Sequence, residues 1–153
     1  MKVRTSLAAA ALASLCGAGP ALAEDCAGKP SATRLNVRVT GVKAAEGQVA
    51  VTLYPDVPRR WLAPKGKLLR ERVTARAPLT TTCFYLPQPG VYAIAIYHDA
   101  NGDQDFNRNL VGMPTEGYGF SNDAPTAIGL PSFESVRFKV NAGQSSMTIR
   151  MRY

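Results

Sequence analysis

Apolar and polar residues alternate in two short stretches of the first third of the chain. In RLNVRVT, Leu35, Val37 and Val39 fall on one side of an extended chain, and QVAVTLY repeats the pattern over residues 48–54. A period of two is typical of strands that bury one face. Because a Glu-Gly pair supplies turn chemistry between them, the sequence predicts that the two strands pair as an antiparallel hairpin.

Five further segments have strand character. LLRERVTA and LTTTCFYL are candidate strands separated near Pro78, and GVYAIAIYHD is apolar on both faces between Val91 and Tyr97. Burial of both faces is expected of a central strand that is covered by two layers. Near the C-terminus, FESVRFKV and SSMTIRMRY flank the turn sequence at residues 141–143, which predicts a second hairpin.

About seven short strands separated by turn signals, without a comparable helical periodicity, predict an all-β fold, an antiparallel β-sandwich. The stretch from Asp99 to Ser132 has no clear strand, so we expect one long loop between the central strand and the C-terminal hairpin. Loops of this length are uncommon in compact domains. Its apolar residues argue against disorder; they are Leu110, Met113, Tyr118, Phe120 and Leu130.

The N-terminus has the pattern of a cleavable secretory signal. Lys2 and Arg4 precede an apolar stretch, and Ala21-Leu22-Ala23 places small residues where a signal peptidase requires them. We therefore expect residues 1–23 to be removed and residues 24–153 to form a single domain in the periplasm or outside the cell. No later apolar stretch is long enough to span a bilayer, so the protein is not expected to be transmembrane.

Two cysteines, Cys26 and Cys83, follow the predicted signal. An even pair in an oxidising compartment predicts a disulfide bond. The pair lacks the close C-x-x-C spacing of redox and zinc motifs, which makes a catalytic or metal-binding role less favourable.

Positive charge exceeds negative charge, with 18 Lys and Arg against 11 Asp and Glu, but it is unevenly distributed. One segment gathers seven basic residues: Arg59, Arg60, Lys65, Lys67, Arg70, Arg72 and Arg76. Such a segment could bind an anionic lipid, an envelope glycan or a protein, or it could be a solvated face. Nucleic acid is not expected as a partner of an exported protein.

Oxygen-bearing side chains occupy alternate positions at the start of the long loop: Asp99, Asn101, Asp103, Asp105 and Asn107. Calcium prefers such oxygen ligands, and Glu116 is the nearest carboxylate downstream. An EF-hand is excluded, because Gly102 comes too early and Leu110 stands where a bidentate Glu is required. The spacing predicts a structural calcium ion over residues 99–107, with capping of backbone amides as the alternative.

His98 is the only histidine, and no nucleophile elbow, metallohydrolase pair or Cys-His arrangement accompanies it. We expect it to be a hydrogen-bonded structural residue. Tyr118 and Phe120 could form, with His98, a surface for a sugar or peptide. The alternative is that the two aromatic residues close the core beneath the loop.

Three separated blocks carry a family resemblance: YHDANGD at residues 97–103, GMPTEGYGFSND at 112–123 and PSFESVRF at 131–138. With these blocks the chain resembles an uncharacterised family of exported bacterial proteins, domain of unknown function 2141. The resemblance covers essentially all of residues 24–153. It implies an immunoglobulin- or transthyretin-like sandwich and an exported location, and it implies no reaction.

The sequence therefore predicts an exported, non-enzymatic envelope or secreted module of binding or structural function and unknown ligand. Calcium is the one cofactor that it suggests. The alternative is a hydrolase-type enzyme of transthyretin-like architecture that uses His98 and Glu116. An open cleft beside His98 that contains Glu116 would favour that alternative.

Overall fold

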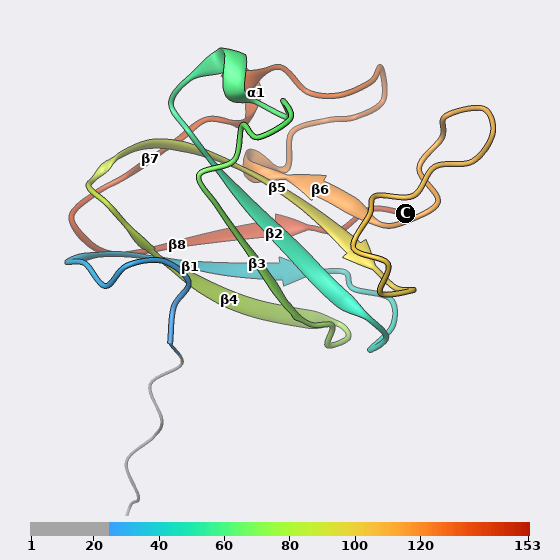
Figure 1. The fold of residues 1–153 in the computed structure, drawn as a ribbon, viewed down its shortest axis with the longest axis horizontal. Helices are drawn as coiled ribbons and strands as arrows, with labels where there is room; N and C mark the ends of the chain where they lie inside the picture. The colour runs from blue at the N-terminus through green and yellow to red at the C-terminus, as the bar shows by residue number, and fades with distance from the viewer. Residues whose placement is uncertain (1–24) are drawn as a thin grey trace, which may run out of the picture.

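A computed structural model describes residues 25–153, so the predicted signal at residues 1–23 lies outside the described part. The described chain contains eight strands and three short helices (Figure 1). The strands are β1 (Thr33–Thr40), β2 (Gln48–Pro55), β3 (Leu69–Thr74), β4 (Leu79–Leu86), β5 (Gly90–Asp99), β6 (Tyr118–Phe120), β7 (Phe138–Val140) and β8 (Gly143–Arg150). The helices are η1 (Pro58–Arg60), η2 (Ser121–Asp123) and α1 (Phe133–Val136).

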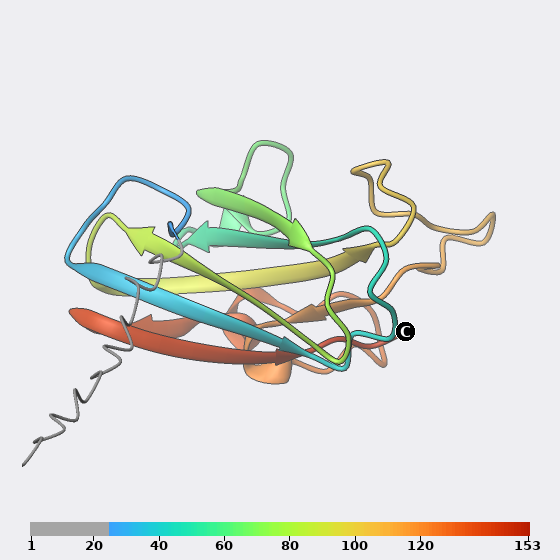
Figure 2. The same cartoon turned by 90° about the horizontal axis from the view of Figure 1, so that it is seen from below.

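These strands form two sheets, which confirms the all-β sandwich (Figures 1 and 2). One sheet has the strand order β4-β1-β8, and the other has the order β3-β2-β5-β6, with β7 also paired to β5. The pairing of β1 with β8 is parallel, and the other pairs of these strands are antiparallel. This two-sheet arrangement agrees with an immunoglobulin-like description.

The main core lies between the two sheets. The residues that alternate in β1, Leu35, Val37 and Val39, are fully buried, and so are their counterparts on the inner face of β2. Most of β5 is buried on both faces, as the sequence predicts, with Ile94 and Ile96 in this core. Alternating apolar residues therefore form strands because each strand turns one side toward the opposite sheet.

Both predicted hairpins are wrong. β1 pairs with β4 and β8, whereas β2 pairs with β3 and β5, so the two strands lie in different sheets. In the same way, β7 pairs with β5 and β8 pairs with β1. Alternation indicates which face of a strand is buried but not which strand lies at its edge. In each case the connecting residues cross from one sheet to the other.

The predicted long loop contains secondary structure that the sequence analysis missed. β6 pairs with β5 and also exchanges backbone hydrogen bonds of 2.8 and 2.9 Å between Tyr118 and Arg152, just after β8. η2 and α1 follow it. A second apolar cluster forms there on the outer face of the larger sheet, from Tyr54, Ala93, Phe120, Ala124, Phe133 and Val136, with Trp61 and Leu62 packed against it.

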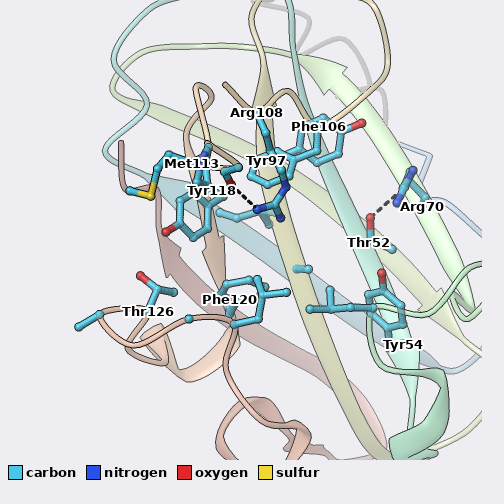
Figure 3. Close-up of a pocket in the computed structure, with 18 residues that line it drawn as sticks. Thr52, Tyr54, Arg70, Tyr97, Phe106, Arg108, Met113, Tyr118, Phe120 and Thr126 are labelled. Carbon is cyan, nitrogen blue, oxygen red and sulfur yellow. Dashed lines mark hydrogen bonds between the residues drawn. The ribbon is translucent and has the colours of Figure 1, made fainter. Parts of the chain in front are cut away.

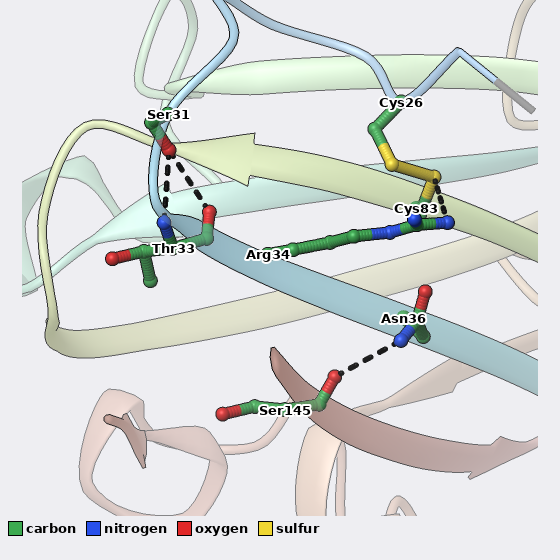
Figure 4. The surroundings of a disulfide bond; sticks show 7 residues. All are labelled: Cys26, Ser31, Thr33, Arg34, Asn36, Cys83 and Ser145. Carbon is green, nitrogen blue, oxygen red and sulfur yellow. Dashed lines mark hydrogen bonds between the residues drawn. A yellow bond between two sulfur atoms is a disulfide. The ribbon is translucent and has the colours of Figure 1, made fainter. Parts of the chain in front are cut away.

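The predicted disulfide between Cys26 and Cys83 is confirmed (Figure 4). It joins the N-terminal segment to β4, and both residues are buried. The guanidinium of Arg34 lies 3.5 Å from the sulfur of Cys83. Within residues 25–153, no helix has the length and apolar character that a membrane-crossing segment needs.

Candidate functional site

The acidic loop after β5 is organised by its own hydrogen bonds. Asp99 is fully buried, and its two carboxylate oxygens accept hydrogen bonds from the backbone N–H groups of Gly102 (2.8 Å) and Gln104 (2.9 Å). Both oxygens therefore stabilise the turn, as Asx capping does. Capping of backbone amides, the alternative to calcium binding in the sequence analysis, describes the contacts of Asp99.

Asp103 is the centre of a second group of contacts in the same loop. Its Oδ2 accepts hydrogen bonds from the side-chain amides of Asn101 (2.8 Å) and Asn107 (2.9 Å), and its Oδ1 accepts one from the backbone of Asp105 (2.8 Å). The Asp105 N–H, followed by the Asn107 and Asn101 amides, lowers the pKa of Asp103 below its ordinary value. Donors that favour the ionised form have this effect.

Glu116 is almost fully buried, and it meets the loop by accepting a hydrogen bond from the backbone of Asn107 (3.1 Å). Asn101, Asp103 and Asn107 thus contact one another, whereas Asp99 and Glu116 accept hydrogen bonds from backbone N–H groups of the loop. Among residues 25–153, no three His, Cys, Asp or Glu side chains form a group suited to a metal ion. Calcium binding stays a prediction.

His98 lies at the end of β5 with only 2% of its surface exposed. Its Nε2 donates to the carbonyl of Glu46 (2.8 Å), since a carbonyl only accepts, and its Nδ1 shares a hydrogen bond of 2.7 Å with the Tyr153 hydroxyl. The same hydroxyl accepts a hydrogen bond from the backbone of Lys43. His98 thus ties together three distant segments, which supports the structural interpretation.

A pocket of about 510 Å³ opens on the outer face of the larger sheet (Figure 3). Neither His98 nor Glu116 is among its lining residues. β2, β5 and β6 form its floor. Residues 106–114 and 126–130, two segments of the long loop predicted between residues 99 and 132, form its walls. The pocket therefore depends on the loop that the sequence singled out, but not on the residues proposed for catalysis.

Aromatic rings dominate the lining: Tyr54, Tyr97, Phe106, Tyr118 and Phe120. Four of these rings form a row of successive edge-to-face or tilted contacts, in the order Tyr97, Phe106, Tyr118, Phe120. Neighbouring ring centroids are 5.7–6.0 Å apart. Such contacts hold each ring in a defined orientation. Phe120 is also part of the second apolar cluster, and Tyr118 packs against that cluster. A ligand surface that joins these two rings to His98 stays a prediction.

Two arginines supply the charge of the pocket. Arg70 donates a hydrogen bond to the hydroxyl of Thr52 (2.8 Å; Figure 3). Arg108 lies over the ring of Phe106 and donates a hydrogen bond to the carbonyl of Gly112 (3.0 Å). No Asp or Glu lines the pocket, and both ion pairs of the described residues belong to Arg137. The two guanidinium groups therefore face the pocket without an acidic partner.

The pocket tyrosines do not offset this charge. Burial raises the pKa of Tyr97 above its ordinary value, although Arg72 and Arg70 act in the opposite direction. Burial likewise raises the pKa of Tyr54, with Arg70 opposing it. A raised pKa favours the neutral hydroxyl, so neither tyrosine supplies a negative charge that offsets the two arginines.

Sequence reasoning missed most of these residues. Tyr54, Arg70, Tyr97, Phe106 and Arg108 come from four separate segments, and their shared location follows from the strand order. One local signal of the pocket was present in the sequence: the residues of β5 that face away from the opposite sheet are also apolar. Three of the apolar loop residues named from the sequence are exposed: Leu110, Met113 and Leu130.

A comparison with known families finds one match. The model of a family described as uncharacterized protein conserved in bacteria (DUF2141) matches residues 37–148, which include part or all of every strand and the whole pocket lining. No curated protein and no solved structure matches the chain.

Proposed function

Because the chain belongs to the DUF2141 family of bacterial proteins, whose description names no reaction, we propose a function from the geometry of the pocket. The protein is an exported, non-enzymatic binding module that holds its ligand on the outer face of the larger sheet. The observation that carries this proposal is the aromatic pocket of about 510 Å³ with two arginines that have no acidic partner.

The size and lining of the pocket support a small ligand. Binding sites for small molecules commonly have volumes of about 300–1,000 Å³, a mostly apolar lining and a few polar groups that fix orientation. Here the rings of Phe106, Tyr118 and Phe120 offer apolar area with few rotatable bonds. Rigid side chains lose little conformational entropy when a ligand binds.

Arg70 and Arg108 define the chemistry of the ligand. A guanidinium recognises a carboxylate, sulfonate or phosphate through paired hydrogen bonds, and its attraction is stronger where acidic competitors are absent. The matching ligand is therefore an amphiphile, with an apolar or aromatic body on the rings and one anionic group toward the arginines.

The remaining residues named by the sequence have supporting roles in this proposal. His98 and Asp99 hold the end of β5, from which the loop to Phe106 departs. Calcium, if the acidic loop binds it, is a structural ion that orders the wall of the pocket. Export is tested by the intact mass of the protein recovered outside the cytoplasm, where the chain should begin at Glu24.

The direct test uses 1-anilinonaphthalene-8-sulfonate, a probe with an aromatic body and one anionic group. Ala95 lies in the pocket floor and is partly exposed there, so Ala95→Phe places its ring in the pocket and not in the core between the sheets. We expect this substitution to weaken probe binding at least tenfold. Thr81→Phe is the matched control, because Thr81 is an exposed strand residue outside the pocket lining.

Charge recognition is tested with Arg108→Gln and a neutral analogue, N-phenyl-1-naphthylamine. The substitution should weaken binding of the anionic probe several-fold and leave the neutral analogue nearly unchanged. Equal effects of Ala95→Phe and Thr81→Phe on probe binding would refute the pocket as the binding site.

A further inference from the structure

One wall of the pocket ends in an apolar tip. In the turn of residues 107–114, the side-chain oxygen of Asn109 accepts hydrogen bonds from the backbone N–H groups of Val111 (3.1 Å) and Met113 (2.9 Å). The turn holds Leu110 and Val111 outward, with exposed fractions of 107% and 81%. Their exposure is thus a property of a hydrogen-bonded turn.

The opposite wall has the same character. Residues 124–131 carry Ile128, with an exposed fraction of 104%, and Leu130, with 59%. The base of this loop is anchored, because the indole N–H of Trp61 donates to the carbonyl of Pro131 (2.9 Å). Both loops project beyond the strands in Figure 1, and both contribute lining residues to the same pocket.

Such clustering is unusual for a surface in contact with water only. Single exposed apolar residues are ordinary, but a group of them beside one opening marks an interaction site. Apart from Tyr153, every large apolar side chain that the described residues leave exposed belongs to these two loops: Leu110, Val111, Met113, Ile128 and Leu130.

The charges around the tips indicate the chemistry of the partner. Neither residues 107–114 nor residues 124–131 contain an acidic side chain, and Arg108 is the only charged residue in them. On the far rim, the basic segment contributes Leu62 and Arg70 to the pocket. None of the seven basic residues of that segment takes part in either ion pair of the described chain.

We infer that these two loop tips dock onto an anionic phospholipid bilayer, with Leu110, Val111 and Ile128 entering the boundary between headgroups and acyl chains. Apolar groups flanked by positive charge are what such a surface binds, at a depth of about 5–10 Å. A second copy of the chain is a poorer occupant, because it would bring the same unpaired arginines together. This inference goes beyond the pocket and does not depend on its ligand.

Vesicle flotation tests the inference, with the exported protein and vesicles of phosphatidylglycerol and phosphatidylethanolamine. The protein should float with them at low salt, and the bound fraction should fall as salt rises. Leu110→Ser combined with Val111→Ser should reduce vesicle affinity at least tenfold. Because both residues are exposed, the melting temperature of the variant should stay unchanged.

Arg108→Gln and Arg38→Gln distinguish an effect of charge beside the loop tips from an effect of net charge on vesicle binding. Each variant removes one exposed positive charge, but only Arg108 adjoins the tips. Arg108→Gln should weaken binding to anionic vesicles several-fold more than Arg38→Gln does. Equal losses, or equal binding of vesicles made only of phosphatidylcholine, would overturn the inference.

Insertion is read out by a tryptophan at the tip. Fluorescence of Leu110→Trp should be quenched by lipids brominated along the acyl chain, whereas the parent, with Trp61 alone, and Thr81→Trp should not. Vesicle binding without quenching of Leu110→Trp would contradict the inserted geometry. Dimerisation that buries the tips, without vesicle binding, would replace the bilayer with a second copy. Probe binding in the pocket is measured without vesicles, so failure of either proposal is recognised independently.

Discussion

Ser121 stabilises the junction between the pocket and the central strand, and its replacement by Ala is a sharp test of the fold. β5 pairs with β7 through residues 90–92 and with β6 through residues 95–97, which leaves Ile94 between the two partners. The fully buried Ser121 fills that position. Its Oγ accepts a hydrogen bond from the N–H of Ile94 (2.9 Å) and donates to the carbonyl of Val136 (2.5 Å).

The magnitude follows from what Ser121→Ala leaves unpaired. One buried N–H and one carbonyl of a buried residue would lose their partner, and leaving a buried polar group unsatisfied costs about 1–3 kcal/mol. We expect the free energy of unfolding to fall by about 2–4 kcal/mol. Ser135→Ala is the control, because its hydroxyl makes exposed contacts within one turn. It should cost less than about 0.5 kcal/mol.

Urea unfolding followed by Trp61 fluorescence measures both variants. Trp61 is the only tryptophan, and its ring contacts Phe120 next to Ser121. The slope of the transition should stay the same while its midpoint falls for Ser121→Ala. A loss below about 0.5 kcal/mol for Ser121→Ala would refute the argument that Ser121 substitutes for a strand partner at Ile94.

Three further predictions concern the disulfide and the acidic loop. Replacing Cys26 and Cys83 by Ser removes a disulfide bond between residues 57 positions apart and should lower the free energy of unfolding by about 4 kcal/mol. Calorimetry of the variant and the parent measures this loss, and an unchanged melting temperature would contradict the prediction. The Asp105 N–H and then the two asparagine amides lower the pKa of Asp103, so the ionised carboxylate of Asp103 stabilises the fold above its unfolded pKa. This stabilisation is lost as pH falls through the lower folded pKa. Asn101→Ala should raise the folded pKa of Asp103 in a carbon-13 NMR titration, and an unchanged pKa would exclude the Asn101 contribution. Calcium at about 100 times its dissociation constant should add roughly 2.7 kcal/mol of stability to the parent and less to Asp103→Ala, whereas magnesium should not; identical melting curves with calcium and with chelator would end the metal hypothesis.

The strands themselves could be predicted because their signals are local. Leu35, Val37 and Val39 alternate over one strand, and the doubly apolar pattern of β5 identifies a central strand. β6 escaped prediction because it has three residues with a glycine between two aromatics. Gly119 is needed there, since a Cβ atom would lie 2.5 Å from the carbonyl oxygen of Arg150.

The pocket could not be predicted because it depends on strand order. The alternation in β2 accounts for its inward residues. Thr52 and Tyr54 become pocket residues only because β5 lies beside β2 and β6 follows β5 in that sheet. Likewise, the alternate spacing of Asp99 and Asp103 suggested a shared ion. In this structure Asp99 accepts hydrogen bonds from backbone N–H groups, and Asp103 accepts them from side-chain amides and one backbone N–H, which local spacing alone does not indicate.

The central claim, that the aromatic pocket is where this protein binds its ligand, is tested most directly by mapping a bound probe onto the structure. In a proton–nitrogen NMR spectrum, saturating 1-anilinonaphthalene-8-sulfonate should shift the amide signals of residues 95–97, 106–113 and 118–120 most strongly. The signals of β1, β4 and β8 should hardly move. Shifts concentrated on those three strands, or none at a saturating probe concentration, would contradict the account.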